Sequence, residues 1–172
     1  MQHDPGQSGT APKPIEPTGF FTGIQFRPIL TGAVVDFIAS FVLAAFYYGF
    51  YVAPNSGASA AFEEEAAKYW ASSEGLAAGL LLGSLGTLIG GFYAAYKAGT
   101  LEMKHGALVG VASIFLGLVM HSGDSDAQFP EWFMALSFAA AIPAGALGGF
   151  FAEMFRSATR GGRRPIYPSQ TG

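Results

Sequence analysis

The sequence predicts an all-α integral membrane protein, a bundle of four transmembrane helices with both termini in the cytoplasm. The main observation is the distribution of charge. Windows 28–53, 75–96, 105–123 and 132–152 together hold 88 residues and one formally charged side chain, Asp36. The other 84 residues carry the remaining 20 charged side chains. Apolar runs of this length exceed those of soluble domains and match the ~30 Å hydrocarbon core of a bilayer.

The overall composition supports this class and excludes several others. Hydrophobic residues make up 51% of the 172 residues and charged residues only 12%, with 24 glycines and no cysteine. The absence of cysteine excludes disulfides, thiolate metal sites, iron–sulfur clusters and a cysteine nucleophile. The net charge is −3, and no basic face with interleaved aromatic residues is present. Nucleic acid is therefore not an expected partner, whereas membrane lipids are.

The chain divides into three regions. Residues 1–27 form a proline-rich tail that ends in an aromatic segment, expected to anchor at the membrane interface. Residues 28–155 form the transmembrane domain, and residues 156–172 form a basic tail. The four spans are expected at about 28–53, 75–98, 103–122 and 131–155. For the loop of residues 54–74, a short amphipathic helix and a solvated loop are both compatible with the pattern.

The orientation follows from the positions of the basic residues, because short loops rich in Lys and Arg stay in the cytoplasm. With both termini inside, Lys68 is the only basic residue on the outer side. The inner side then collects Lys13, Arg27, Lys97, Lys104, Arg156, Arg160, Arg163 and Arg164. The compact chain favours a bacterial origin, so the sequence predicts a multi-pass protein of the bacterial inner membrane.

Small residues recur at every fourth position in all four spans. Lipid tails provide little hydrophobic drive for helix association, so helices in a membrane pack through stripes of small residues that let their backbones approach. The glycines expected to pack in this way are Gly32, Gly79, Gly83, Gly86, Gly90, Gly106, Gly110, Gly145 and Gly149. We therefore expect tight packing within the chain, and a stripe left over is compatible with self-association.

Asp36 is the most informative single residue. An ionised carboxylate inside the hydrocarbon region costs on the order of 2–3 kcal/mol, so it requires a partner. Asp36 shares a stripe with Gly32 and Ser40, which directs it toward the protein interior. We predict a buried polar cluster of Asp36 with Tyr93 or His105 in the cytoplasmic half of the membrane. Its simplest role is to fix the helix register, and a proton or ion relay is the alternative.

His105 is the candidate cofactor ligand, because histidine can serve as an axial ligand for a haem or pigment. A capping or anchoring role at the helix end is the alternative interpretation. No metal site is expected, because the sequence carries no motif typical of one. It also lacks a serine–histidine–acid constellation, a phosphate-binding loop and a pair of catalytic carboxylates, so we expect no enzyme activity.

The spans contain three motifs: Gly32-x-x-x-Asp36 in the first, Gly90-Gly91-Phe92-x-Ala94 in the second, and His105-Gly-Ala-x-x-Gly110 in the third. With these motifs the chain resembles, from about residue 28 to 154, a family of small uncharacterised bacterial four-span inner-membrane proteins. The resemblance implies the four-span layout alone, because the family has no assigned activity to carry over.

The function that the sequence favours is that of a non-enzymatic accessory subunit. Such a subunit packs against a larger membrane complex of the photosynthetic or respiratory type, so other membrane subunits or a second copy are the expected partners. One alternative is a small oligomeric transporter or channel for protons or a small solute. Another is a bundle that binds a lipid, quinone or pigment, although no cofactor is required.

Overall fold

A computed structural model describes residues 19, 21–55, 62–121 and 129–160. This part of the chain contains five α-helices and no strand. The helices are α1 (Phe26–Tyr47), α2 (Phe62–Ala71), α3 (Ser73–Ala98), α4 (Glu102–His121) and α5 (Glu131–Arg160). A π-helical turn, Tyr48–Val52, and a 3₁₀ turn, Ala53–Asn55, extend α1. Most of the predicted N-terminal tail, and the basic tail beyond Arg160, lie outside the described residues.

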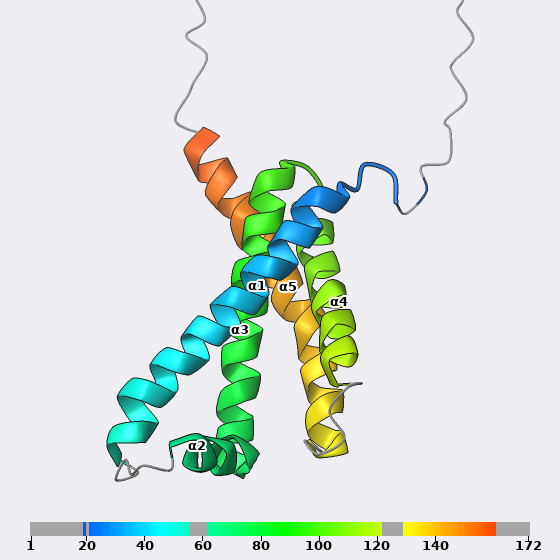
Figure 1. Cartoon of the computed structure of the whole chain (residues 1–172). Coiled ribbons are helices and arrows are strands. Elements are labelled where there is room, and N and C mark those ends of the chain that lie inside the picture. The colour runs from blue at the N-terminus through cyan, green and yellow to red at the C-terminus, as the bar shows by residue number, and fades with distance from the viewer. Residues whose placement is uncertain (1–18, 20, 56–61, 122–128, 161–172) are drawn as a thin grey trace, which may run out of the picture.

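Four of the five helices are long and apolar enough to cross a membrane, as the sequence predicts. Helix α3 packs against both α1 and α5, and α4 packs mainly against α5. The start of α1, the end of α5 and the α3–α4 connection lie at one end of the bundle, and α2 lies at the other (Figure 1). The four long helices therefore alternate in direction through the bundle.

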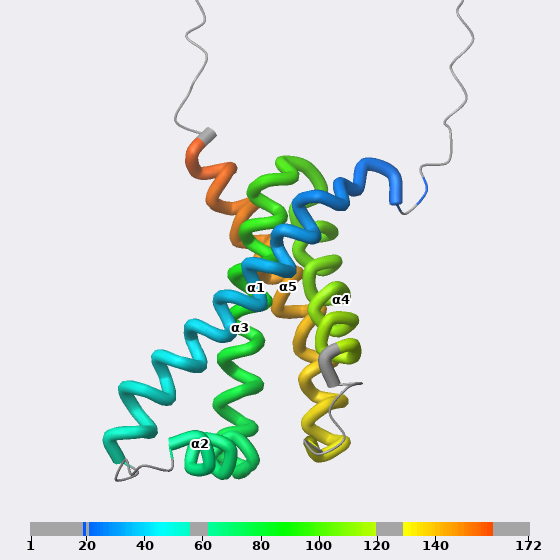
Figure 2. Tube along the Cα trace, viewed as in Figure 1, coloured from blue at the N-terminus to red at the C-terminus, as the bar shows by residue number. Residues whose placement is uncertain are grey.

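Helix α1 is the least enclosed of the four. It crosses α3 and then diverges from it toward α2, as the trace in Figure 2 shows. Only 17% of its most apolar window is buried, compared with 33% for α3. A wide apolar surface of α1 is thus left without a partner among the described residues.

Small residues fill the interior and large apolar residues cover the surface. Ala94, Ala95 and Ala152 are fully buried, whereas Phe41 and Phe115 are 70% and 69% exposed. A protein folded in water would bury such aromatic side chains, because each removes a large apolar area from solvent. The inverted pattern fits a bundle whose surroundings are as apolar as its surface.

Glycine-to-backbone contacts hold α3, α4 and α5 together. A Cβ atom at Gly106 would overlap the carbonyl oxygen of Gly145, and one at Gly110 would overlap that of Ala141. The same close approach occurs between α1 and α3, where Gly32 faces Gly90. The remaining predicted packing glycines with such contacts are Gly86, against Ser40, and Gly149, against Glu102.

Two of the predicted packing glycines do not serve this purpose. A Cβ at Gly83 would meet nothing within 4 Å, and one at Gly79 would reach only the Trp70 ring, at 3.9 Å. Their stripe continues α3 beyond the depth at which α1 diverges, so no neighbouring backbone is close. The sequence pattern also overlooked Gly91 and Gly148, where α3 and α5 meet backbone to backbone.

The loop between the first two spans forms the amphipathic helix α2. Its aromatic face packs against the end of α1, where the Tyr69 hydroxyl lies 2.9 Å from that of Tyr47. Burial, together with this hydrogen bond, raises the pKa of Tyr69, so its hydroxyl stays neutral. The Ser72 hydroxyl then caps α3 by accepting a hydrogen bond from the Gly75 N–H at 3.1 Å.

The backbone contacts predict an asymmetric response to adding one methyl group along α4. Gly106→Ala places its Cβ against the Gly145 carbonyl, so we expect it to lower the free energy of unfolding by about 1–3 kcal/mol. The matched control Gly117→Ala adds the same methyl group where nothing lies within 4 Å, and it should leave the stability unchanged or higher. Denaturation in detergent micelles measures both, and equal stability of the two variants would contradict the packing role of Gly106.

Candidate functional site

Asp36 is buried at the centre of the bundle, with 5% of its surface exposed. It lies ten residues after the start of α1, about 15 Å along the helix axis. Three hydroxyl groups contact its carboxyl group. Ser40 comes from the next turn of α1, Thr87 from the middle of α3, and Ser113 from the middle of α4.

The contacts of these hydroxyls use both carboxyl oxygens. Ser40 Oγ lies 3.2 Å from Oδ1, and Thr87 Oγ1 lies 3.2 Å from both Oδ1 and Oδ2. Ser113 Oγ is in close contact with Oδ2. Thr87 and Ser113 also approach carbonyl oxygens of their own helices, those of Gly83 at 3.0 Å and Val109 at 2.9 Å. We call Asp36, Ser40, Thr87 and Ser113 the oxygen cluster.

The predicted grouping of Asp36 with Tyr93 and His105 differs from the observed contacts. Asp36 bonds to the hydroxyls of the oxygen cluster, and the Tyr93 ring instead lies under Lys97, whose Nζ is 5.7 Å from the ring centroid. His105 instead contacts Gln25. Gln25 precedes Asp36 by eleven residues, which is about 16 Å along a helix. The prediction placed all three residues at one depth, whereas His105 contacts the start of α1 and the Tyr93 ring packs against Lys97.

His105 is fully buried and joins the start of α1 to the start of α4. Its Nδ1 lies 3.0 Å from the Leu101 carbonyl oxygen, and its Nε2 accepts a hydrogen bond from the Gln25 N–H at 3.0 Å. The ring is therefore the neutral tautomer that carries its proton on Nδ1. Because these hydrogen bonds occupy both nitrogens, His105 is positioned as a structural clamp and has no free nitrogen for an axial ligand.

The side chain of Gln25 strengthens this clamp by donating to the Ala98 carbonyl oxygen at 3.1 Å. Nearby, Arg156 of α5 pairs with Glu102 at 3.0 Å and donates to the Tyr96 carbonyl oxygen. These contacts satisfy backbone carbonyls at the end of α3, which would otherwise lack intrahelical partners. The polar contacts at this end of the bundle thus tie all four long helices together.

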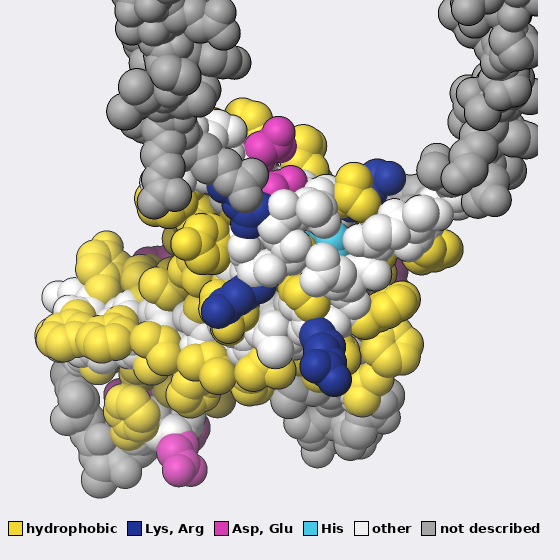
Figure 3. Space-filling model, turned by 90° about the horizontal axis from the view of Figure 1, so that it is seen from above, with side chains coloured by type: hydrophobic (Ala, Val, Ile, Leu, Met, Phe, Trp, Pro, Cys, Tyr) yellow, Lys and Arg dark blue, Asp and Glu magenta, His cyan; other side chains and the backbone are white. Residues whose placement is uncertain are grey.

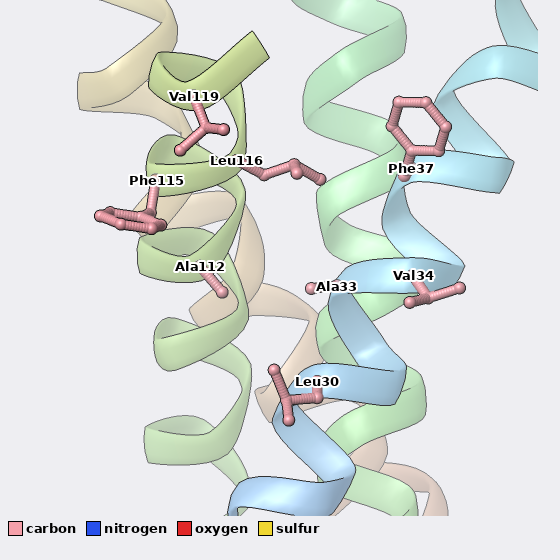
Figure 4. A pocket seen from close by; sticks show the side chains of 8 residues that line it. All are labelled: Leu30, Ala33, Val34, Phe37, Ala112, Phe115, Leu116 and Val119. Atoms are coloured by element: carbon pink, nitrogen blue, oxygen red, sulfur yellow. The ribbon is translucent and has the colours of Figure 1, made fainter.

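Several cavities lie between the helices of the described part of the chain. One, of about 640 Å³, is a groove between α1 and α4. Figure 4 shows Leu30 and Ala33 of α1 facing Ala112 and Leu116 of α4 across it. Its lining is completed by Val34, Phe37, Phe115 and Val119 and is wholly apolar. We call it the α1–α4 groove.

Two smaller cavities lie beside the oxygen cluster. One, of about 180 Å³, is lined by Ser113 and Ser137 among apolar residues of α4 and α5. The other, of about 70 Å³, lies between α3 and α5 and is lined by Gly83, Ser84 and Ser137. Ser137 and Ala141 line both cavities, so the two adjoin.

The described residues contain no group of three or more His, Cys, Asp or Glu side chains that could hold a metal ion. What they bring together is a single carboxyl group surrounded by hydroxyls. Thr87 and Ser113 were missed by the sequence analysis, although each is a polar residue at the middle of an apolar span. That position, shared with Asp36, was the signal that could have identified them.

Comparison of the chain with protein-family models, curated proteins and solved structures gave no match. The resemblance to the four-span bacterial family therefore stays a prediction from the sequence motifs.

The clamp predicts that His105 contributes to stability. His105→Ala leaves the part-buried Gln25 N–H and Leu101 carbonyl without this partner and opens a cavity at a fully buried position, so we expect a loss of about 2–5 kcal/mol in unfolding free energy. Met103→Ala, at a half-exposed position two residues away on the same helix, is the control and should cost less than about 1 kcal/mol. Thermal unfolding in detergent measures both. If His105→Ala were as stable as the wild type, the clamp would not be a stabilising element.

Proposed function

We propose that this protein is a non-enzymatic, multi-pass membrane protein that acts as an accessory subunit of a larger membrane complex. The observation that supports this proposal best is the α1–α4 groove. Its centre is lined by the small residues Ala33 and Ala112, and larger apolar side chains flank them. Close approach of helices in lipid requires such small residues, so the groove suits a transmembrane helix of another subunit.

The low burial of α1 points to the same surface. Leu30 and Phe37, which border the groove, are 65% and 47% exposed. A partner helix seated between α1 and α4 would contact both of these side chains. The photosynthetic or respiratory nature of the complex stays a prediction from the sequence.

The distribution of charge supports a bacterial inner-membrane location with both termini in the cytoplasm. Among the described residues, Arg27, Lys97, Lys104 and Arg156 lie in segments at the end shared by the start of α1 and the end of α5, where basic side chains gather (Figure 3). Lys68 of α2 is at the opposite end, beside acidic residues of the same helix. Under the positive-inside rule the first end faces the cytoplasm.

The proposal predicts a partner that depends on the groove. Extraction of the tagged full-length protein in a mild detergent, followed by native mass spectrometry, should show it bound to at least one other membrane subunit. Ala33→Phe fills the groove and should reduce the bound fraction about tenfold, since steric overpacking costs about 1–3 kcal/mol. Ala135→Phe makes the same change at an exposed position of α5 and should have no effect.

Two results would contradict an accessory role. One is recovery of only a monomer or a homodimer in detergents that preserve other membrane complexes. The other is a bound subunit that Ala33→Phe retains as fully as the control variant does.

A further inference from the structure

The oxygen cluster gathers five side-chain oxygen atoms from three helices near the middle of the membrane. Two belong to the carboxyl group of Asp36, and the others belong to Ser40, Thr87 and Ser113. In the described part of the chain, Asp36 has hydroxyl partners only and forms no ion pair. The carboxyl group therefore has no positive side chain to balance it, and an uncompensated carboxylate is unfavourable inside a bilayer.

The hydroxyl groups of the oxygen cluster also have fewer hydrogens than there are acceptor oxygens around them. Each hydroxyl carries one hydrogen, yet Thr87 and Ser113 each face both the carboxyl group and a carbonyl oxygen of their own helix. Hydroxyls in membrane helices commonly donate to the carbonyl four residues earlier. When Thr87 and Ser113 do so, their lone pairs point toward Asp36. One positive species, a proton or a metal cation, then completes the site.

We propose that the oxygen cluster binds one monovalent alkali cation, with Na⁺ as the representative ion, in exchange for the proton of Asp36. Hard cations prefer carboxylate, hydroxyl and carbonyl oxygen ligands, and this cluster offers no other type. In the exchange, the O–H bond of the Asp36 carboxyl breaks, the proton leaves to water, and the cation takes its place. The site is electrically neutral before and after the exchange, whereas a divalent ion would leave a net positive charge in the membrane.

The cavities beside the cluster supply the access that an exchangeable ion needs. Ser113 belongs both to the cluster and to the lining of the 180 Å³ cavity, and Gly83, whose carbonyl accepts from Thr87, lines the 70 Å³ cavity. Ser84 and Ser137 add hydroxyls to the lining. A Cβ atom at Gly83 would meet nothing within 4 Å, so this glycine does not serve helix packing. Its open space instead gives water and the ion a route from the α2 end of the bundle.

The test is a sodium titration of the purified full-length protein in detergent at weak buffering capacity. Addition of NaCl should release up to one proton per chain, whereas the same concentration of N-methylglucamine chloride should release none. Equilibrium dialysis with radioactive sodium should show saturable binding at one site per chain, and raising the proton concentration should weaken it. This exchange does not depend on the accessory role proposed above, because it is measured on the isolated chain.

Variants identify the site. Asp36→Asn should abolish both proton release and sodium binding, whereas Glu153→Gln, the same change at an exposed acidic residue of α5, should leave both unchanged. Thr87→Val and Ser113→Ala each remove one ligand and should weaken sodium binding about 10-fold or more. Thr31→Val is their control, because its hydroxyl bonds only within the first turns of α1.

Three outcomes would overturn the proposal. The first is the absence of sodium-dependent proton release and of saturable binding in the folded wild-type protein, which would leave Asp36 as a permanently protonated packing residue. The second is wild-type binding by Asp36→Asn. The third applies if Asp36→Asn fails to fold. In that case the proposal is overturned when Thr87→Val and Ser113→Ala both bind sodium as strongly as the wild type does.

Discussion

Close contact between helix backbones is the constraint on which the rest of this structure depends. Moving an apolar side chain from lipid into a protein interior gains little free energy. Helices of this kind therefore associate where glycine, which has no side chain, lets their backbones touch. Gly106 against Gly145 and Gly32 against Gly90 are such points. They fix how closely α1 approaches α3 and how closely α4 approaches α5, and the polar contacts then have defined distances. The large apolar side chains remain on the outside, as expected for a bundle that crosses a membrane.

The polar groups of the interior add specificity to this packing. At one end of the bundle, the His105 ring joins two helix starts, and near it Arg156 holds the end of α3. In the middle, Asp36 connects α1, α3 and α4 through hydroxyls. Toward α2 the helices diverge, polar contacts give way to aromatic ones around Tyr69, and the cavities appear. The molecule thus has a closely tied end and a more open end, with the oxygen cluster between them.

Much of the fold follows from the sequence alone, because charge-free windows and small-residue periodicity are properties of single helices. The burial of Asp36 also followed, since a charge on a small-residue stripe must face inward. Its partners did not follow, because they depend on how far one helix slides along another. The sequence pattern placed Asp36 at the depth of His105. In the structure His105 contacts Gln25, which precedes Asp36 by about 16 Å along a helix. The same limit explains Gly79 and Gly83, whose stripe looks like a packing surface but faces the region from which α1 has diverged.

The most direct measurement of the central claim is labelling of single cysteines, which the absence of native cysteine makes unambiguous. Glu64→Cys on α2, Thr100→Cys between α3 and α4, and Thr159→Cys near the end of α5 all place the thiol at exposed positions. If four helices cross the membrane as proposed, a membrane-impermeant maleimide applied to intact spheroplasts should label the first position only. The other two should react after the membrane is permeabilised. Labelling of Glu64→Cys and Thr159→Cys from the same side, or recovery of the chain in the soluble fraction without detergent, would contradict a four-span membrane bundle.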